Sequence, residues 1–405
     1  VMTPSTGKAH EGLLYGRVST DDGVIYEGRL RFGGEEEAFW GHYFNAVKEE
    51  TLWATHVPRE RLPTVRDPIE VFGKEIAAWE RPMDLGRPFM VRFGDIARIE
   101  APGRDLRVVL KSGTMFDLDR FGGDDLADGV RVWDDRHGVV DLDEWRIRTI
   151  EFLPTGRLSA VPDRLYGTVR TRHGDFTGFI QWNREESVGR DELDGHTDNG
   201  EFSLRFDHIR SIARHSRNSS LVTLLDGREI VLSGNREVGR GNRGMYVVDR
   251  RYGRVLISWD AFERIDFSAG GASPAYSAFS PGRPLTGSVI TRSGRRVAGR
   301  LIYDLDESET TETLDAPAQG VHYTIPFGLI ASIGLPALED ERAQPARVTL
   351  RTGEELRLEL TDDLGEWNAG MLIFFDDGQR PEYVPWTDVQ QVDLSTEAAA
   401  IRPGR

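Results

Sequence analysis

The sequence contains no cysteine, no long apolar run and no excess of basic residues. Zero cysteine in 405 residues excludes disulfides, thiolate metal sites and thiol catalysis. Apolar runs all stay below the roughly 20 residues that a membrane-spanning helix needs, so any membrane association is expected to be peripheral or through another protein. The formal net charge of −16 repels phosphate backbones, and we therefore expect no nucleic-acid partner.

Apolar residues are nevertheless sufficient for several folded domains. Hydrophobic residues make up 39% of the chain and nine of its residues are Trp, which argues against intrinsic disorder. A chain of this length exceeds what one core usually supports, so we expect about three domains. The 44 Gly and 19 Pro are scattered without a collagen-like period, as in chains of many short strands and tight turns. An all-β fold is predicted.

A hairpin signature of the form Val-x-(Thr or Leu)-x-x-Gly recurs six times. Alternating Val and Thr or Leu form one face of a strand, and Gly supplies the turn that reverses the chain. Each copy of the signature begins one module of the chain. Modules one, three and five have a further Gly in each strand of the hairpin, which indicates that the repeating unit is a pair of modules. The six copies are Val18 to Gly23, Val108 to Gly113, Val169 to Gly174, Val222 to Gly227, Val289 to Gly294 and Val348 to Gly353.

A second pattern, an aromatic residue followed by apolar residues three and six positions later, comes after each hairpin. This spacing predicts one tight helical turn that leads into a last strand, with all three side chains facing one core. One copy departs from it, because Glu144 takes the aromatic position and Trp145 follows. The regular copies begin at Phe93, Phe206, Trp259, Phe327 and Trp386.

The linkers agree with pairing, because Pro/Gly/Ser-rich stretches fall after every second module. Neither end of the chain shows periodicity, and we expect both ends to fray. The predicted organisation is an N-terminal extension at 1–12, a first pair at 13–152 with an insertion at 33–88, a linker at 153–165, a second pair at 166–267, a linker at 268–284, a third pair at 285–394 and a C-terminal tail at 395–405.

The first hairpin of each pair, such as residues 169–180, resembles the first motif of Sm-like small barrels, an SH3-like fold. Residues 248–255 are similar to the strand-turn-strand of PRC-type barrels, a family used in RNA processing and in photosynthetic reaction-centre subunits. Both resemblances are at the level of the fold. They imply three tandem pairs of small SH3-like or Sm-like β-barrel modules, six in all. A six-bladed β-propeller is the alternative, since the module spacing also suits blades.

Motifs that could carry chemistry are better explained by structure. Residues 239–244 match Gly-x-Gly-x-x-Gly but precede a β-type run, so they predict a loop and no cofactor. Asp304, Asp306 and Ser308 have the first spacings of a calcium loop, but Glu309 replaces its Gly, so a solvated acidic loop is expected. No His, Asp, Glu or Ser is found at one place in all three pairs. We predict no catalytic, cofactor-binding or metal-binding residue.

The insertion is where a partner is expected to dock. Helix-like spacing of Phe39 or Trp40 with Tyr43 and Phe44, and the run at 74–79, predict a partly helical segment. Its aromatic density is typical of either a local mini-core or an interface. The candidate partner-binding residues are Phe39, Trp40, Tyr43, Phe44, Trp53, Phe72 and Trp79.

These features favour a non-enzymatic scaffold or binding protein that holds other protein subunits together. The expected setting is a bacterial envelope or membrane-associated complex, for which a photosynthetic reaction centre is one example. The chain begins at Val1 rather than Met, which favours export, so we expect a periplasmic or envelope-associated protein and leave the cytoplasm open. The alternatives are a carboxylate-dependent hydrolase of glycan or peptide and RNA binding through Sm-like surfaces.

Overall fold

The computed structural model describes residues 9–33, 36–48, 51–71, 74–120, 124–234, 236–271, 273–337 and 344–395. These residues form strands and short helical turns, and every strand pair described for them is antiparallel. The predicted all-β class is confirmed. No helix in this part of the chain is long and apolar enough to cross a membrane.

The helical elements are all short. Those of the described residues are α1 (Asp124–Ala127) and the 3₁₀ turns η1 (Ala9–Gly12), η2 (Leu52–His56), η3 (Arg59–Arg61), η4 (Phe93–Asp95), η6 (Glu144–Arg146), η7 (Phe206–His208), η8 (Tyr276–Ala278), η9 (Phe327–Leu329), η10 (Asp362–Leu364) and η11 (Trp386–Asp388).

The first pair contributes eight strands to one sheet, in the order β11-β10-β2-β1-β12-β7-β8-β9. Strand β12, the last of them in the chain, therefore lies in the middle of the sheet. Strands β3 and β6 form a small sheet of their own, as do β4 and β5 of the insertion. The bounds are β1 (Tyr15–Thr20), β2 (Ile25–Phe32), β3 (Tyr43–Lys48), β4 (Thr64–Val71), β5 (Lys74–Pro82), β6 (Arg87–Arg92), β7 (Ile96–Glu100), β8 (Asp105–Leu110), β9 (Met115–Asp119), β10 (Val130–Asp134), β11 (Gly138–Leu142) and β12 (Ile147–Phe152).

The second pair has the same strand order, written β21-β20-β14-β13-β22-β17-β18-β19. Its sheet continues beyond β19 into β15 and β16, two strands that follow the first hairpin in the chain. The bounds are β13 (Tyr166–Thr171), β14 (Gly174–Gln181), β15 (Glu192–Thr197), β16 (Gly200–Arg205), β17 (Ile209–Ser216), β18 (Ser219–Leu224), β19 (Glu229–Ser233), β20 (Met245–Asp249), β21 (Gly253–Ile257) and β22 (Phe262–Phe267).

The third pair repeats the order once more as β31-β30-β24-β23-β32-β27-β28-β29. One topology therefore occurs three times along the chain. The bounds are β23 (Thr286–Thr291), β24 (Arg296–Ile302), β25 (Thr313–Ala318), β26 (Val321–Pro326), β27 (Ile330–Gly334), β28 (Ala346–Leu350), β29 (Glu355–Leu358), β30 (Met371–Phe374), β31 (Glu382–Val384) and β32 (Val389–Leu394).

The two modules of a pair are intertwined rather than placed side by side. In the second pair, the hairpin β13–β14 of the earlier module lies between β22 and β20 of the later one. The hairpin β18–β19 of the later module lies between β17 and β15 of the earlier one. Each hairpin thus completes its sheet with strands of the other module. The result is an open sheet in its hydrogen-bonded order, rather than two separately closed barrels or the four-stranded blades of a propeller.

The closing turns form as predicted. The aromatic residue begins a 3₁₀ turn in η4, η7, η9 and η11, and the turn leads directly into a strand. Phe93, Ile96 and Ile99 are all fully buried in the core of the first pair, as their spacing required. Trp259 begins a simple turn instead, but it is buried as well.

The extra glycines of each pair sit opposite each other across the first hairpin, at positions where strands approach closely. The partners are Gly16 and Gly28 in the first pair, and Gly167 and Gly178 in the second. A Cβ at Gly178 would lie 1.9 Å from the carbonyl oxygen of Val248 on the adjacent strand. Any larger residue would push β20 away, so the strand exchange depends on these glycines.

The chain divides into two compact units. Unit 1 comprises Val1–Ala46, Phe89–Gly282 and Ala318–Thr324, so it holds the first and second pairs. Unit 2 comprises Val47–Pro88, Arg283–Pro317 and Ile325–Arg405, so it holds most of the insertion together with the third pair.

The insertion differs from the helical prediction in its aromatic segments. Tyr43 and Phe44 begin strand β3, and residues 74–79 lie in strand β5, so the helices predicted at these places are wrong. Helical turns form between them instead, as η2 and η3. The spacing of these aromatic residues gave the wrong prediction because it extends over only four to six residues. Over so short a stretch, the alternating pattern of a strand cannot be distinguished from the apolar stripe of a helix.

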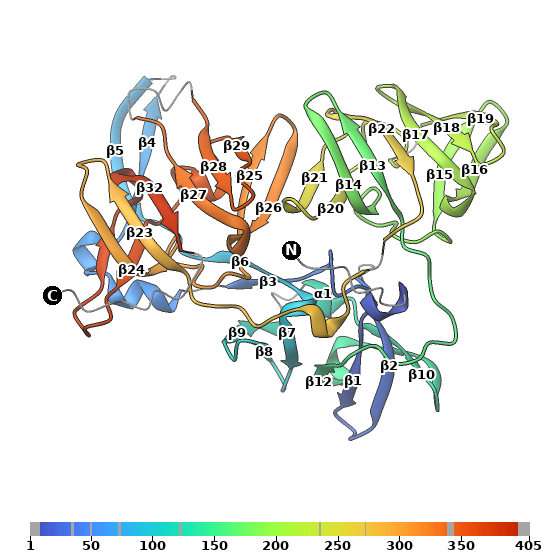
Figure 1. Cartoon of the computed structure of the whole chain (residues 1–405), viewed down its shortest axis with the longest axis horizontal. Helices are drawn as coiled ribbons and strands as arrows, with labels where there is room; N and C mark the ends of the chain where they lie inside the picture. Colours follow the sequence, from blue (N-terminus) through green and yellow to red (C-terminus); the bar gives the residue numbers. More distant parts are fainter. Residues whose placement is uncertain are drawn as a thin grey trace. The chain divides into compact units, whose positions relative to one another are not determined.

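Within unit 2, the insertion shares a core with the third pair. Val57 of the insertion is buried against a group of apolar residues from the third pair, and Trp53 packs edge-on against Phe374 at 5.8 Å between ring centroids. In Figure 1 the blue turns of the insertion lie beside the orange and red strands of the third pair. The third-pair members of this core are Ile302, Leu305, Ala369, Leu372 and Tyr383.

The segment predicted as the second linker is anchored by its aromatics. Tyr276 and Phe279 join the core of the first pair, and the Tyr276 hydroxyl donates to the carbonyl of Ile96 at 2.7 Å. Of the N-terminal extension, which was expected to fray, residues 9–12 form η1. Residues 1–8 and 396–405 lie outside the described residues.

Candidate functional site

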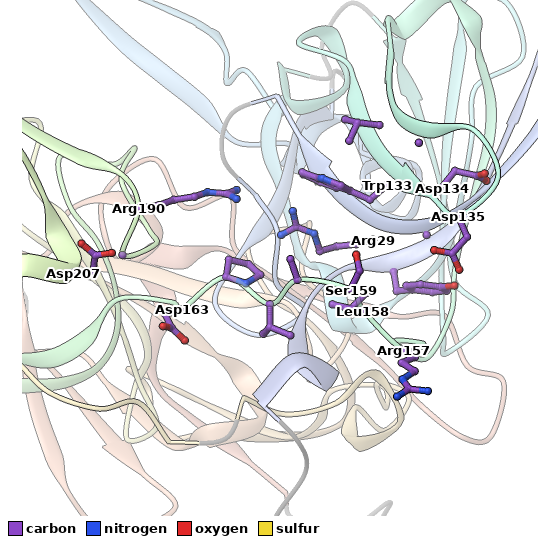
Figure 2. A pocket seen from close by; sticks show the side chains of 18 of the residues that line it. Arg29, Trp133, Asp134, Asp135, Arg157, Leu158, Ser159, Asp163, Arg190 and Asp207 are labelled. Carbon is purple, nitrogen blue, oxygen red and sulfur yellow. The ribbon is translucent and has the colours of Figure 1, made fainter.

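Unit 1 contains a pocket of about 460 Å³ beside the edge of the first pair's sheet (Figure 2). Its wall on one side is formed by Arg29 of β2 and by the hairpin of β10 and β11, including Trp133 and Val139. Residues 157–163 of the first linker line a second side, and Arg190 comes from a turn of the second pair. The pocket therefore draws on the first pair, the linker and the second pair.

Arg29 is the most buried cation of the pocket. Only 5% of Arg29 is exposed, and its guanidinium carbon lies 3.5 Å from the centroid of the Trp133 ring, a stacked cation–π geometry. One of its nitrogens is 3.3 Å from the Glu37 carboxylate, which is fully buried. Burial lowers the pKa of Arg29 to about 10, although the negative charge of Glu37 acts to raise it. The group remains a cation at neutral pH.

Glu37 and its loop are held by His42. The backbone N–H groups of Glu37 and Ala38 both donate to the Nδ1 atom of His42, at 2.9 and 3.1 Å. Burial holds the pKa of His42 well below its ordinary value, and nearby arginines lower it further, so the ring stays neutral and accepts these bonds. This neutral acceptor fixes the loop that presents Glu37 to Arg29.

Arg190 faces Arg29 across the pocket. Figure 2 shows the two guanidinium groups pointing toward one another, and the charge of Arg190 lowers the pKa of Arg29. The turn that carries Arg190 is fixed because the Asp191 carboxylate accepts the backbone N–H groups of Ser187 and Val188. Among the residues that the structure describes, Arg190 forms no ion pair. Two facing cations favour an anion between them.

Two of the four acidic residues that line the pocket, Asp134 and Asp207, have partners of their own. Burial acts to raise the pKa of Asp134, but backbone N–H groups from Glu27, His137 and Arg136 outweigh it and hold the pKa at about 2. Asp207 is paired with Arg205. These two carboxylates therefore organise the walls of the pocket, whose other acidic residues are Asp135 and Asp163.

The pocket is suited to binding a carboxylate-bearing group beside an apolar surface. Two arginines offer planar donor sets that match a carboxylate, and Trp133 with Val139 gives an apolar flank. In the part of the chain that the structure describes, no three His, Asp or Glu side chains are placed to hold a metal ion.

The residues predicted to bind a partner are distributed over both units. Phe39, Tyr43 and Phe44 are buried within unit 1, at 3% exposure or less, and Trp40 packs there against Phe279. Trp53 belongs to the core of unit 2. Of the other two, Trp79 is 57% exposed on β5, and Phe72 lies outside the described residues.

The acidic loop of the third pair is buried, so its prediction as a solvated loop is wrong. Asp304 and Asp306 are only 3% and 6% exposed. Two cations of the insertion neutralise them. Lys48 lies 2.6 Å from Asp306, and Arg87 lies 2.7 Å from Asp304. Burial acts to lower the pKa of Lys48, but Asp306 and Glu312 outweigh it and raise the pKa.

A glutamate with a buried carboxyl oxygen occurs at the same place in all three pairs, so the expectation that no acidic residue is repeated is wrong. Glu36, Glu186 and Glu307 each accept, through the backbone carbonyl, the N–H of an aromatic residue four positions earlier. Their Oε2 atoms have no hydrogen-bond partner among the described residues. The sequence signal was this aromatic-to-Glu spacing at Phe32, Trp182 and Tyr303, which is not part of the glycine pattern of the hairpins.

A second carboxyl group accompanies each of these glutamates. Asp125, Glu237 and Asp363 each accept a backbone N–H of a neighbouring strand, at 2.6 to 2.7 Å. Burial and then the charge of this companion raise the pKa of Glu36 and of Glu186 to about 8. The pKa of Glu307 is raised as well, by burial and then by Asp306 and Asp363.

Neither the pocket nor the repeated carboxyl pair is explained by likeness to other proteins. No model of a known protein family matches the chain, and no curated protein matches it. The resemblance to Sm-like and PRC-type barrels therefore stays a prediction.

Proposed function

We propose that the chain is a non-enzymatic scaffold or binding protein and that its pocket holds a carboxylate-bearing group of a partner protein. The observation that carries this proposal is the pair of guanidinium groups, Arg29 and Arg190, that face each other beside Trp133. Burial of a cation as deep as Arg29 is costly unless the cation is paired. Glu37 supplies one partner, and a ligand carboxylate would supply the second.

Binding is favoured over hydrolysis by the state of the acidic groups. A carboxylate-dependent hydrolase needs two carboxyl groups that face the same cleft, one of them protonated near neutral pH. Asp134 in the pocket has a low pKa and is saturated by backbone donors. The carboxyl groups with raised pKa values, such as Glu36 and Glu186, do not line the pocket.

The proposed setting is a complex in which this chain is a peripheral protein subunit, at the bacterial envelope or at a membrane. Three copies of one strand topology give it several similar surfaces for subunits. Cell fractionation with an epitope tag tests the setting directly. Recovery in the cytosolic fraction alone would rule out the envelope part of the proposal.

The binding function is tested by reversing one charge. Arg190→Glu leaves the fold intact, because Arg190 is exposed and forms no ion pair in the described structure, yet it places a negative charge opposite Arg29. We expect the partner recovered with the tagged chain, measured by quantitative mass spectrometry, to fall about tenfold. Arg217→Glu, an exposed arginine outside the pocket, is the matched control. Equal partner recovery with both variants would contradict the proposal.

A further inference from the structure

The three pairs place an equivalent strand at one end of their shared eight-strand topology: β11, β21 and β31. An edge strand exposes unpaired N–H and C=O groups and readily accepts another strand, so proteins usually cover or block such edges. Two of these three equivalent edges are covered or blocked, and the third is left for a partner.

The edge of the second pair is covered by a strand from elsewhere in the chain. Within unit 1, β21 pairs antiparallel with residues 321–324, with Arg254 opposite Thr324 and Ile257 opposite Val321. Covered in this way, Arg254 is 8% exposed and Val255 is fully buried. This topology therefore already accepts an added strand at this position.

The edge of the third pair is blocked. Strand β31 has only three residues and is preceded by Pro381, which has no N–H to offer. Within unit 2, a guanidinium nitrogen of Arg61 donates to the carbonyl of Tyr383 at 3.1 Å. A short strand, a proline and a satisfied carbonyl together discourage strand addition.

The edge of the first pair has neither protection. Strand β11 is the terminal strand of its sheet among the described residues, and Val139 is 57% exposed, whereas its equivalent Arg254 is 8% exposed. The strand also borders the pocket, because Gly138 and Val139 line it. Val139 lies opposite Trp133 across the hairpin, so both side chains are on the face that the pocket occupies.

We propose that an extended segment of the partner protein adds antiparallel to β11, as residues 321–324 add to β21. The side chain opposite Val139 then projects on the pocket face, and an acidic residue there places its carboxylate between Arg29 and Arg190. This inference rests on the proposed binding function for the pocket. The recognised ligand is an extended segment with β-forming residues and one acidic side chain directed into the pocket.

The chain supplies its own probe. A synthetic peptide of residues 320–326 carries the strand that covers β21, and Thr324 is the residue that corresponds to the position opposite Val139. Three fluorescent versions are compared: the unchanged peptide, one with Thr324→Glu and one with Thr324→Lys. We expect the Thr324→Glu peptide to bind the full chain about tenfold more tightly than the Thr324→Lys peptide, measured by fluorescence polarisation up to about 1 mM.

Proline variants of the edge test strand addition itself. Successive residues of an antiparallel strand direct their N–H groups alternately toward the neighbouring strand and away from it. Val139→Pro and Val140→Pro therefore remove donors on opposite sides of β11. We expect the variant that loses the outward donor to keep the thermal stability of the wild type and lose peptide binding. Met115→Pro, on the exposed edge strand β9 at the other end of the same sheet, is the matched control and should bind normally.

The outcomes separate the two proposals. Unchanged binding in both proline variants, or absence of binding by all three peptides, overturns strand addition, and the Arg190→Glu experiment still decides the pocket. Binding that depends on β11 but is equal for the Glu and Lys peptides supports strand addition and contradicts a carboxylate pocket. A concentration-dependent dimer that the variant without the outward donor abolishes would assign the edge to a second copy of this chain and overturn the proposed partner.

Discussion

Glu36, Glu186 and Glu307 occupy one place in the three pairs, and each has a second carboxyl group as its companion. When the pKa of a carboxyl group is higher in the folded state than in the unfolded state, the protonated carboxyl group stabilises the folded state relative to the ionised one. Its contribution is therefore fully present below the unfolded pKa and is lost as pH rises through the folded pKa. For Glu186, that interval runs from the ordinary value of 4.5 to about 8.

Replacing one of these glutamates by its neutral isostere should remove part of this pH dependence. The Tm of the wild type should fall between pH 5 and pH 8.5. We expect this fall to be about 4 °C smaller in Glu186→Gln, because about 1 kcal/mol moves the Tm of a large domain by about 2–4 °C. Partial access of water keeps the effect well below the nominal value of about 1.4 kcal/mol per pKa unit. Thermal unfolding followed by circular dichroism across this pH range provides the measurement.

Glu192→Gln is the control for this experiment, because Glu192 is exposed at the start of β15 in the same pair. Parallel pH profiles for the wild type and for Glu186→Gln would show that the buried carboxyl group does not couple to folding.

At the scale of strands, the paired glycines set how closely neighbouring strands approach. A Cβ at Gly178 would be 1.9 Å from the Val248 carbonyl oxygen, whereas one at Gly271 would meet no atom within 4 Å. We expect Gly178→Ala to lower the free energy of unfolding by about 1–3 kcal/mol, as overpacking does, and Gly271→Ala to leave it nearly unchanged. Chemical denaturation of both variants gives the comparison, and equal midpoints would contradict a steric role for Gly178.

Sequence patterns predicted the local parts of these sheets and missed the pairing between them. Hairpins such as residues 169–174 and closing turns such as Phe93–Asp95 follow from residue spacing, because the contacts that form them are local. The exchange that places β20 and β22 on either side of β13–β14 depends on contacts far apart in the chain. Periodicity carries no information about which of several similar strands will pair.

The pocket was equally beyond the sequence. Arg29 and Arg190 belong to different pairs, and neither stands in a motif. They come together through the packing of the first linker and of two loops. His42 accepts a backbone N–H in one of these loops, and the Asp191 carboxylate does so in the other. Single arginines are common on surfaces, so only their convergence distinguishes these two.

At the scale of the whole molecule, unit 2 is assembled from separate stretches of chain. Residues 47–88 supply Val57, Trp53 and other apolar side chains to the core of the third pair. We expect deletion of residues 49–86 to destabilise unit 2 by several kcal/mol, because burial is worth about 25 cal/mol per Å² of apolar surface. Calorimetry should show one unfolding transition shifted downward and the transition of unit 1 retained.

A shorter deletion, of residues 66–79, is the matched control. It removes much of β4 and β5, including the exposed Trp79, but keeps the apolar residues that pack on the third pair. This variant should melt like the wild type. If the longer deletion also melts like the wild type, the insertion does not contribute to the stability of unit 2.

The same division of unit 2 has a consequence for synthesis on the ribosome. Residues 47–88 leave the ribosome before most of unit 1, and the strands they pack against begin about 195 residues later. At translation rates of about 5–20 residues per second, the insertion waits for about 10–40 s with side chains such as Trp53 and Leu62 uncovered. During that interval the nascent chain presents an apolar segment that chaperones can bind, and unit 2 can fold only after the third pair has been synthesised.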